Sequence, residues 1–133
     1  MAYADTVKKI YEAFGRADVP AILDQLADDV EWEYGINSTE VPWLQPLKGR
    51  EHVSEFFQAL GGLTIKGFRP KTFLEAGQIV VVLIDLDATV KATGRPVVEE
   101  DEVHIWYFNS AGMVARFRHR VDTHQQWLAH TGN

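Results

Sequence analysis

The chain has 133 residues, the length of a single domain, because two separate folding units would each lack an adequate core. Hydrophobic residues make up 46% and charged residues 24%, a globular balance that excludes intrinsic disorder. The formal net charge of -6 leaves no basic stripe for nucleic acid or for an anionic membrane, and we expect neither as a partner.

The sequence has no cysteine, so neither a disulfide framework nor thiolate chemistry is available. Residues 1–5 lack the basic and apolar regions of a signal peptide, and the longest strongly apolar run, residues 76–84, is too short to span a bilayer. We therefore expect a cytoplasmic location. The histidines show no HExxH or HxH spacing, and no glycine-rich phosphate loop or GxSxG motif occurs. We expect no metal and no cofactor.

Three runs in the first half have the period of amphipathic helices. Residues 3–14 place five apolar side chains on one side of a helix that Gly15 would end. Asp18 is a candidate N-cap for a second apolar stripe over residues 19–27. A third helix over residues 53–60 stops at a pair of glycines.

A short strand and an apolar loop separate the second and third of these helices. Val30, Trp32 and Tyr34 alternate with acidic residues, which is the period of a half-buried strand. Residues 36–48 contain several turn formers, but residues such as Trp43 make the segment too apolar for a solvated linker. We expect this loop to pack as a lid.

β-Branched and aromatic residues dominate the second half, in runs separated by turn residues. These runs predict four long antiparallel strands, over residues 63–75, 78–93, 97–109 and 113–122. Thr123 and Gln126 have the spacing of a capping box that opens a short C-terminal helix. The order predicts a single α+β domain, with the helices packed on one face of a curved antiparallel sheet of about five strands, one of them short.

The predicted strand over residues 97–109 is apolar on both faces. One face carries His104, Trp106 and Phe108, and the other carries Val103, Ile105 and Tyr107. The helices cover only one face, so the other needs a different cover, and in a chain this short a second copy of the protein supplies it. We expect a homodimer that packs through the convex face of the sheet.

The order and spacing of several segments resemble the nuclear transport factor 2-like superfamily, in its branch of SnoaL-like polyketide cyclases and ketosteroid isomerases. These segments are residues 11–15, 18–32, 47–51 with Phe56 and Phe57, 103–112 and 117–123. The resemblance implies a cone-shaped α+β barrel with an apolar pocket between the helices and the concave sheet. It also implies a homodimer formed through the convex face.

The superfamily does not determine the chemistry, because one fold hosts many functions. In ketosteroid isomerase an aspartate base moves a proton, while a tyrosine and a protonated aspartate hold the enolate oxygen. By the resemblance, the tyrosine falls on Tyr11, the base on Tyr34 and the protonated aspartate on His104. A phenol with the ordinary pKa of ~10 is a poor base at neutral pH, so we do not expect ketosteroid isomerisation itself.

Two candidate catalytic residues each have two interpretations. His104 lies among aromatic residues and is either an acid–base group for a ligand or a core histidine held by a neighbour such as Glu102. Simple alternation places Glu100 and Glu102 on the face of His104, and it places His119 inward on the last strand. SnoaL-like relatives carry an acid–base aspartate near the end of this strand. Asp122 resembles it and points either to the pocket mouth or to solvent.

The expected function is cofactor-independent proton transfer on an apolar cyclic substrate, as in an isomerase, cyclase or hydrolase. The expected catalytic residues are His104, Tyr34, Tyr11 and Asp122. The expected ligand-binding residues are Trp32, Trp43, Phe57, Trp106, Phe108, His119 and Glu102. The alternative is a binding module that shields an apolar ligand, and core packing also explains the tryptophans. A carboxylate within hydrogen-bond reach of His104 would favour the enzyme.

Overall fold

The computed structural model describes residues 2–33 and 40–132. Within them, one sheet with the strand order β2-β1-β6-β5-β4-β3 packs against helices. The elements are α1 (Ala2–Gly15), α2 (Val19–Leu23), β1 (Leu26–Glu33), the 3-10 turn η1 (Pro42–Leu44), β2 (Leu47–Lys48), α3 (Arg50–Leu60), β3 (Leu63–Ala76), β4 (Ile79–Val90), β5 (Pro96–Phe108), β6 (Val114–Arg120) and α4 (Thr123–Thr131).

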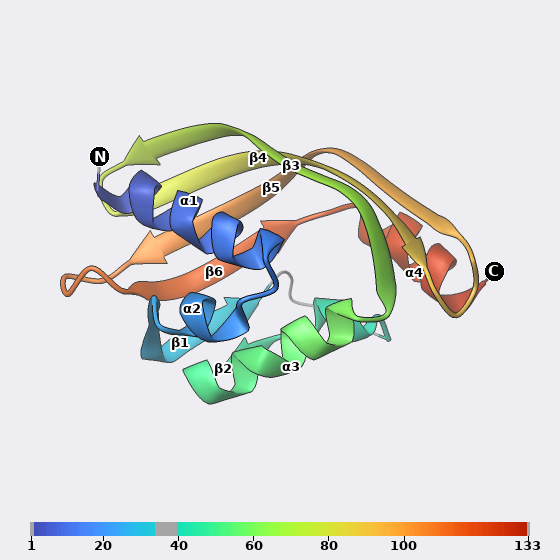
Figure 1. Ribbon diagram of the computed structural model, residues 1–133, viewed down its shortest axis with the longest axis horizontal. Helices are drawn as coiled ribbons and strands as arrows, with labels where there is room; N and C mark the ends of the chain where they lie inside the picture. The colour runs from blue at the N-terminus through green and yellow to red at the C-terminus, as the bar shows by residue number, and fades with distance from the viewer. Residues whose placement is uncertain (1, 34–39, 133) are drawn as a thin grey trace.

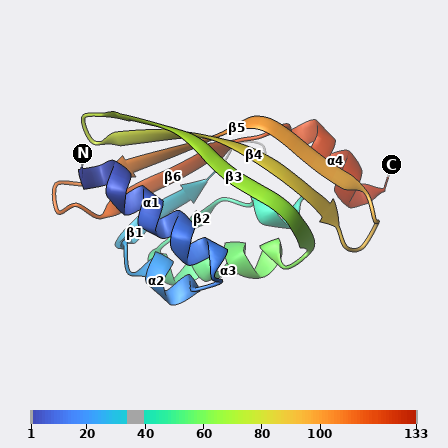
Figure 2. The ribbon, with the colours of Figure 1, turned by 45° about the horizontal axis from the view of Figure 1, so that its top comes forward.

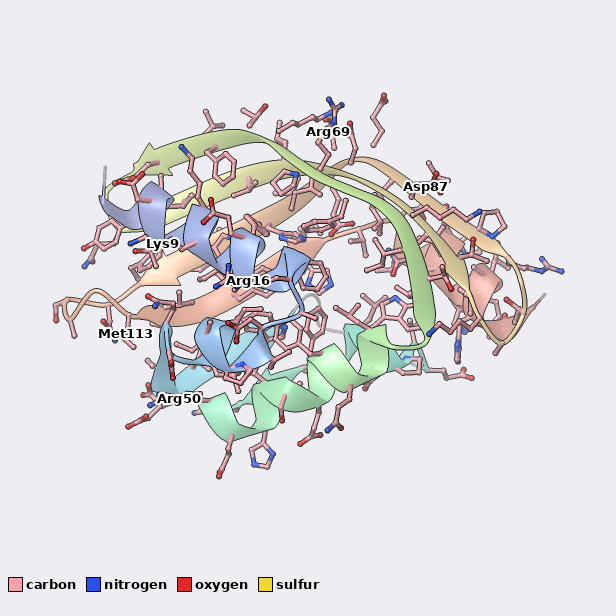
Figure 3. All side chains as sticks on the ribbon, viewed as in Figure 1. Lys9, Arg16, Arg50, Arg69, Asp87 and Met113 are labelled. Atoms are coloured by element: carbon pink, nitrogen blue, oxygen red, sulfur yellow. The ribbon has the colours of Figure 1, made fainter. Side chains whose placement is uncertain are left out.

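The sheet curves around the helices (Figure 1). α1, α2 and α3 lie against its concave side, and α4 lies beside the β4–β5 hairpin near its turn, as the turned view also shows (Figure 2). Side chains fill the space between the helices and the sheet, whereas labelled charged residues such as Lys9, Arg50 and Arg69 point outward (Figure 3). In the described part of the chain, no helix has the length and apolarity needed to cross a membrane.

The predicted α+β class and curved sheet are confirmed, but the sheet is mixed rather than wholly antiparallel. β1 pairs with β6 in parallel, with Trp32 opposite Phe117. The extra strand β2 lies in the segment that was predicted to be an irregular loop, and it pairs with β1. Pairing between strands so far apart in sequence leaves no mark on their periodicity, which explains both differences.

Helix α2 ends earlier than its apolar stripe predicts. Asp18 is the N-cap, as expected, and its carboxylate accepts a hydrogen bond from the amide of Ala21. The helix stops at Leu23, and Leu26 begins strand β1. The predicted capping box at the start of α4 is off by one residue. The helix begins at Thr123, but its N-cap is Asp122, which accepts from the amide of Gln125 at 2.9 Å.

A bulge in β5 changes which acidic residues face inward. Ile84 pairs with Glu102 and Leu86 with Glu99, so β5 has one more residue than β4 between these pairs. Asp101 adopts the left-handed conformation at φ 62° within the bulge. Glu99 and Glu102 are therefore both buried, and the expectation that Glu100 shares the inner face is wrong, because Glu100 is exposed.

Candidate functional site

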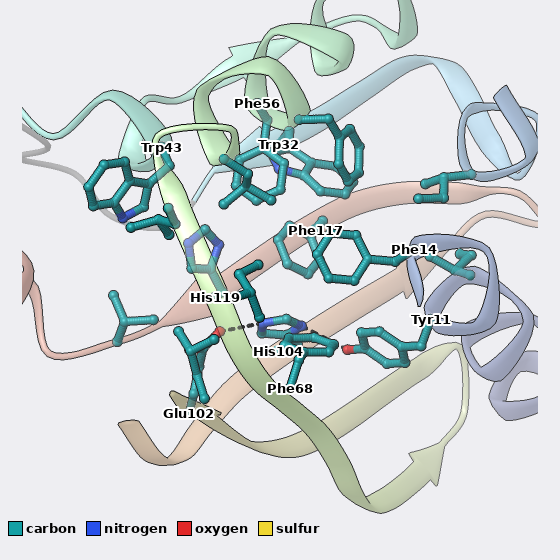
Figure 4. A pocket seen from close by; sticks show the side chains of 18 of the residues that line it. Tyr11, Phe14, Trp32, Trp43, Phe56, Phe68, Glu102, His104, Phe117 and His119 are labelled. Atoms are coloured by element: carbon teal, nitrogen blue, oxygen red, sulfur yellow. Dashed lines mark hydrogen bonds and ion pairs between the residues drawn. The ribbon is translucent and has the colours of Figure 1, made fainter. Parts of the chain in front are cut away.

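A cavity lies between the helices and the concave face of the sheet (Figure 4). Its wall is mostly apolar and aromatic. Phe14 on α1, Phe57 on α3 and Phe68 on β3 line it and are partly exposed, so the cavity reaches the surface between these elements. Measured by the positions that the centre of a water molecule can occupy, the volume of the cavity is about 80 Å³. Because a buried water needs roughly 10–15 Å³ on this scale, a molecule of one or two rings fits.

Four polar side chains in the cavity wall form a hydrogen-bonded chain. Figure 4 labels three of them, Tyr11, His104 and Glu102. Trp106 Nε1 donates to Tyr11 Oη at 3.0 Å. Tyr11 Oη lies 2.7 Å from His104 Nδ1, and His104 Nε2 lies 2.6 Å from Glu102 Oε2. Tyr11 comes from α1 and the other three come from β5, where alternate residues face inward.

These hydrogen bonds occupy both ring nitrogens of His104, so neither nitrogen is available for direct contact with a ligand. Both nitrogens are within hydrogen-bond distance of protein atoms, Nδ1 of Tyr11 and Nε2 of Glu102. A proton therefore passes between a ligand and this hydrogen-bonded network through Tyr11 or Glu102, and not directly at His104. The second oxygen of the Glu102 carboxylate, Oε1, is buried and has no hydrogen-bond partner among the described residues.

Burial sets the protonation of two groups around His104. Desolvation raises the pKa of Tyr11 well above its ordinary value, and the hydrogen bond from Trp106 only partly opposes this, so the phenol keeps its proton. His119 lies opposite His104 on β6, with ring centroids 5.8 Å apart. Desolvation, with smaller contributions from His104 and Arg120, holds the pKa of His119 well below its ordinary value, so its ring is neutral.

A second polar network includes two residues of the cavity wall, Trp43 and Gln126. Trp43 Nε1 donates to Gln126 Oε1 at 2.7 Å, and Gln126 Nε2 donates to Glu99 Oε2 at 2.9 Å. Glu99 also accepts from the amide of Asp122. Burial raises the pKa of Glu99 above its ordinary value. This network ties η1 and α4 to β5.

Most of the predicted ligand-binding residues line the cavity. They are Trp32, Trp43, Phe57, Trp106, His119 and Glu102. Phe108 lies outside the wall and packs on Tyr3, with ring centroids 4.6 Å apart. Of the predicted catalytic residues, Tyr11 and His104 are brought together, and Tyr34 lies outside the described residues.

Asp122 lies away from this cavity. It caps α4 and lines a separate surface depression with Arg95, His124 and Gln125.

The sequence did not predict the network of Glu99 and Gln126, because plain strand alternation gives no sign of the bulge that turns Glu99 inward. Among the described residues, no three acidic or histidine side chains are grouped so that they could hold a metal ion.

Comparison with known proteins identifies relatives of this architecture. The model of the SnoaL-like domain family matches residues 7–117. An NTF2-like protein of unknown function from Burkholderia pseudomallei is 28% identical, with a TM-score of 0.85 and 98% of both chains covered. TerC, co-crystallised with polyporic acid, is 22% identical, with a TM-score of 0.81 over 98% of this chain and 99% of TerC.

A protein from Mesorhizobium loti whose name reads "putative SnoaL-like polyketide cyclase [carbohydrate phosphatase]" is 21% identical to this chain. Its TM-score is 0.70, over 90% of this chain and 98% of that protein. None of the curated proteins that were compared matches the sequence. The likeness to these structures shows an NTF2-like fold, which hosts more than one chemistry.

Proposed function

The chain belongs to the SnoaL-like domain family, and we propose that it is an enzyme that transfers a proton on a small, apolar, cyclic carbonyl compound. The hydrogen-bonded chain of Tyr11, His104 and Glu102 in the wall of an apolar cavity carries this proposal. A histidine between a phenol and a carboxylate is equipped to relay a proton near neutral pH.

The carboxylate of Glu102 favours an enzyme over a plain binding module. A module that shields an apolar ligand needs only shape and apolar surface. Glu102 instead places an ionisable group, 6% exposed, beside His104, and burying such a group is unfavourable unless it is paired. His104 supplies that pairing, and a carboxylate paired with an imidazole in the wall of a ligand cavity is typical of acid–base catalysts.

The aromatic wall supports a cyclic substrate. Trp32 and Phe117 stack at a centroid distance of 4.2 Å, and with Trp106 they offer flat apolar surfaces to a ring. The Mesorhizobium loti neighbour is named for polyketide cyclisation, and that name fits a ring substrate that carries a carbonyl oxygen.

Deuterium exchange into a model ketone tests the proposal. We expect the wild-type chain to speed exchange at the carbonyl-adjacent carbon of 2-tetralone in D2O by at least about tenfold over buffer, as a positioned acid–base group does. The exchange is followed by proton NMR. Leu60→Trp, which fills the cavity from α3, should abolish the acceleration. Gln58→Trp is the matched control, because Gln58 is an exposed residue of the same helix.

Binding of 2-naphthol without exchange of 2-tetralone would show that the chain is a binding module and not an enzyme. 2-Naphthol is the probe for binding, because it has the shape of an enol of 2-tetralone and fluoresces. If the wild-type chain binds 2-naphthol in the cavity and leaves the exchange of 2-tetralone at the buffer rate, the chain shields ligands and does not transform them.

A further inference from the structure

We propose that Glu102 is the base that takes the proton from the substrate, and that Glu102 and His104 share one proton at neutral pH, which frees the phenol of Tyr11 to donate to the substrate oxygen. This inference rests on the function proposed above and names its substrate class, an enolisable cyclic ketone. It also assigns His104 a positioning role, since both of its ring nitrogens are bonded within the protein.

The first support is the unequal state of the two Glu102 oxygens. Oε2 lies 2.6 Å from His104 Nε2, whereas Oε1 is buried and has no hydrogen-bond partner among the described residues. Buried polar atoms in native proteins are nearly always paired, and an exception calls for an explanation. Glu102 belongs to the cavity wall, and a turn of its carboxyl group that brings Oε1 to a bound substrate would pair this oxygen.

The second support is the charge around His104. The titratable groups that face it are Tyr11 from α1, His119 from β6 and Glu102 from β5. Phe68 from β3 is apolar and also faces the ring. Arg120, the next residue after His119, is exposed.

Tyr11 and His119 are both neutral because burial shifts the pKa of each toward its uncharged form. An ionised Glu102 beside a neutral His104 would therefore leave one uncompensated negative charge in an aromatic wall, which is costly in a medium of low polarity. One additional proton in the Glu102–His104 pair makes the wall neutral.

The shared proton determines what Tyr11 does. The proton sits either on the imidazole, which is then an imidazolium beside a carboxylate, or on Glu102, which then donates to Nε2. In both states His104 Nδ1 carries a hydrogen and donates to Tyr11 Oη. Trp106 Nε1 donates to the same oxygen. The phenol oxygen then accepts two hydrogen bonds, and its own hydrogen is free for the substrate.

The proton transfer then balances. In the imidazolium state, Glu102 Oε1 accepts the hydrogen on the carbon next to the substrate carbonyl, and an O–H bond forms as the C–H bond breaks. The C–H electron pair becomes the C=C bond, and the carbonyl π pair moves onto the oxygen, where the hydroxyl of Tyr11 donates to it. The imidazolium of His104 balances the enolate charge, and return of the proton from Glu102 to carbon completes the cycle.

Exchange of 2-tetralone in D2O tests the role of Glu102. Glu102→Gln keeps an oxygen that accepts from His104 but removes the base, so we expect exchange to fall on the order of 100-fold or more. Its affinity for 2-naphthol should stay within about threefold of wild type. Glu100→Gln is the matched control, because Glu100 is exposed on the same strand, and it should keep the wild-type exchange rate.

The outcomes separate this inference from the proposed function. If the wild-type chain speeds exchange and Glu102→Gln retains that rate, the base lies elsewhere and only this inference is wrong. If the wild-type chain neither speeds exchange nor binds 2-naphthol, the proposed function fails and the role of Glu102 falls with it.

A measurement on the wild-type chain tests the shared proton even if Glu102→Gln does not fold. Nitrogen-15 NMR of the His104 ring, assigned with a His104→Gln variant, reports whether each ring nitrogen carries a hydrogen. We expect a hydrogen on Nδ1 at pH 7, and a bare Nδ1 with a hydrogen on Nε2 alone would overturn the inference. The additional proton belongs to the Glu102–His104 pair, so Glu102→Gln should lose the hydrogen on Nδ1, and a retained Nδ1 hydrogen in this variant would contradict the inference.

Discussion

The hydroxyl of Tyr11 joins helix α1 to strand β5. It lies 2.7 Å from His104 Nδ1 and accepts from Trp106 Nε1 at 3.0 Å. Tyr11→Phe removes one oxygen and leaves two buried nitrogens, His104 Nδ1 and Trp106 Nε1, without their hydrogen-bond partner. We expect this to destabilise the fold by about 1–3 kcal/mol, as measured by denaturant unfolding.

Tyr3→Phe is the control for this prediction. Tyr3 also lies on α1 and packs on an aromatic ring, at a centroid distance of 4.6 Å from Phe108. Its loss of a hydroxyl should change the stability by less than about 0.5 kcal/mol. Equal effects of the two substitutions would show that the Tyr11 hydroxyl contributes little to the fold.

The stability of the chain should depend on pH through His119. Burial holds the pKa of His119 below its ordinary value of 6.5 in the folded chain. Below pH 6.5 the unfolded chain therefore takes up a proton that the folded chain does not. The contribution to stability is fully present above the unfolded pKa and falls by at most about 1.4 kcal/mol for each pH unit below it.

His119→Leu should remove this part of the slope. The difference in unfolding free energy between wild type and His119→Leu, measured from pH 7 to pH 5, isolates His119 from Glu99, whose raised pKa acts in the opposite direction. His124→Gln, at an exposed position of α4, is the control. The difference in unfolding free energy between wild type and His124→Gln should stay constant from pH 7 to pH 5. Parallel curves for wild type and His119→Leu would contradict the prediction.

Part of the site is readable from single residues. Strand alternation placed His119 inward, and it put Glu102, His104 and Trp106 on one face of β5. The family resemblance implied that this face looks into the pocket. The bond from Tyr11 to His104 joins residues 93 apart. It depends on how α1 lies across the sheet, so periodicity does not predict it. The family resemblance placed both residues in the pocket but did not predict the bond between them.

At the scale of elements, the bulge in β5 lets Glu99 and Glu102 both face inward. Asp101 sits in it at φ 62°, and Lys71 contacts both Asp101, at 2.6 Å, and Asp85, at 2.8 Å. Hydrogen bonds from Lys71, Arg69 and the amide of Asp101 hold the pKa of Asp85 well below its ordinary value. Charged side chains from β3, β4 and β5 thus form ion pairs with one another beside the bulge.

Replacing Asp101 should separate the effect of its backbone conformation from that of its charge. A β-branched residue tolerates the left-handed region poorly, so Asp101→Val should destabilise the chain by roughly 1–2 kcal/mol. Asp101→Gly loses the same ion pair without that strain and should cost less. Thermal unfolding of both variants compares them directly, and equal losses would mean that the ion pair, not the conformation, holds the bulge.

The order of elements was predictable where each element is amphipathic by itself. The period of apolar residues located α1, α3 and the long strands. It failed at residues 24–29, where Leu26 and Ala27 continue the stripe of α2 but belong to β1. Pairing with β6 decides their conformation, through the Leu26–Val114 register, and local sequence does not report a partner so distant.

At the scale of the whole molecule, the outer face of the sheet has no cover within the described chain. The helices α1, α2 and α3 lie on the concave side (Figure 2). Five outward side chains of the central strands β4 and β5 are apolar and only partly buried. They are Val81, Leu83, Val103, Ile105 and Tyr107. Arg116 and Arg118 of β6 lie over the Tyr107 ring, at 5.7 and 5.9 Å from its centroid.

We propose that a second copy of the chain covers this face and forms a homodimer, because contiguous apolar surface in the middle of a sheet favours association. Sedimentation at micromolar concentration should give about twice the chain mass of 15.1 kDa. Ile105→Glu places a charge in the centre of the face and should give a folded monomer or an unfolded chain. Ala92→Glu, in the exposed β4–β5 turn, should stay dimeric, and a wild-type monomer under these conditions would contradict the proposal.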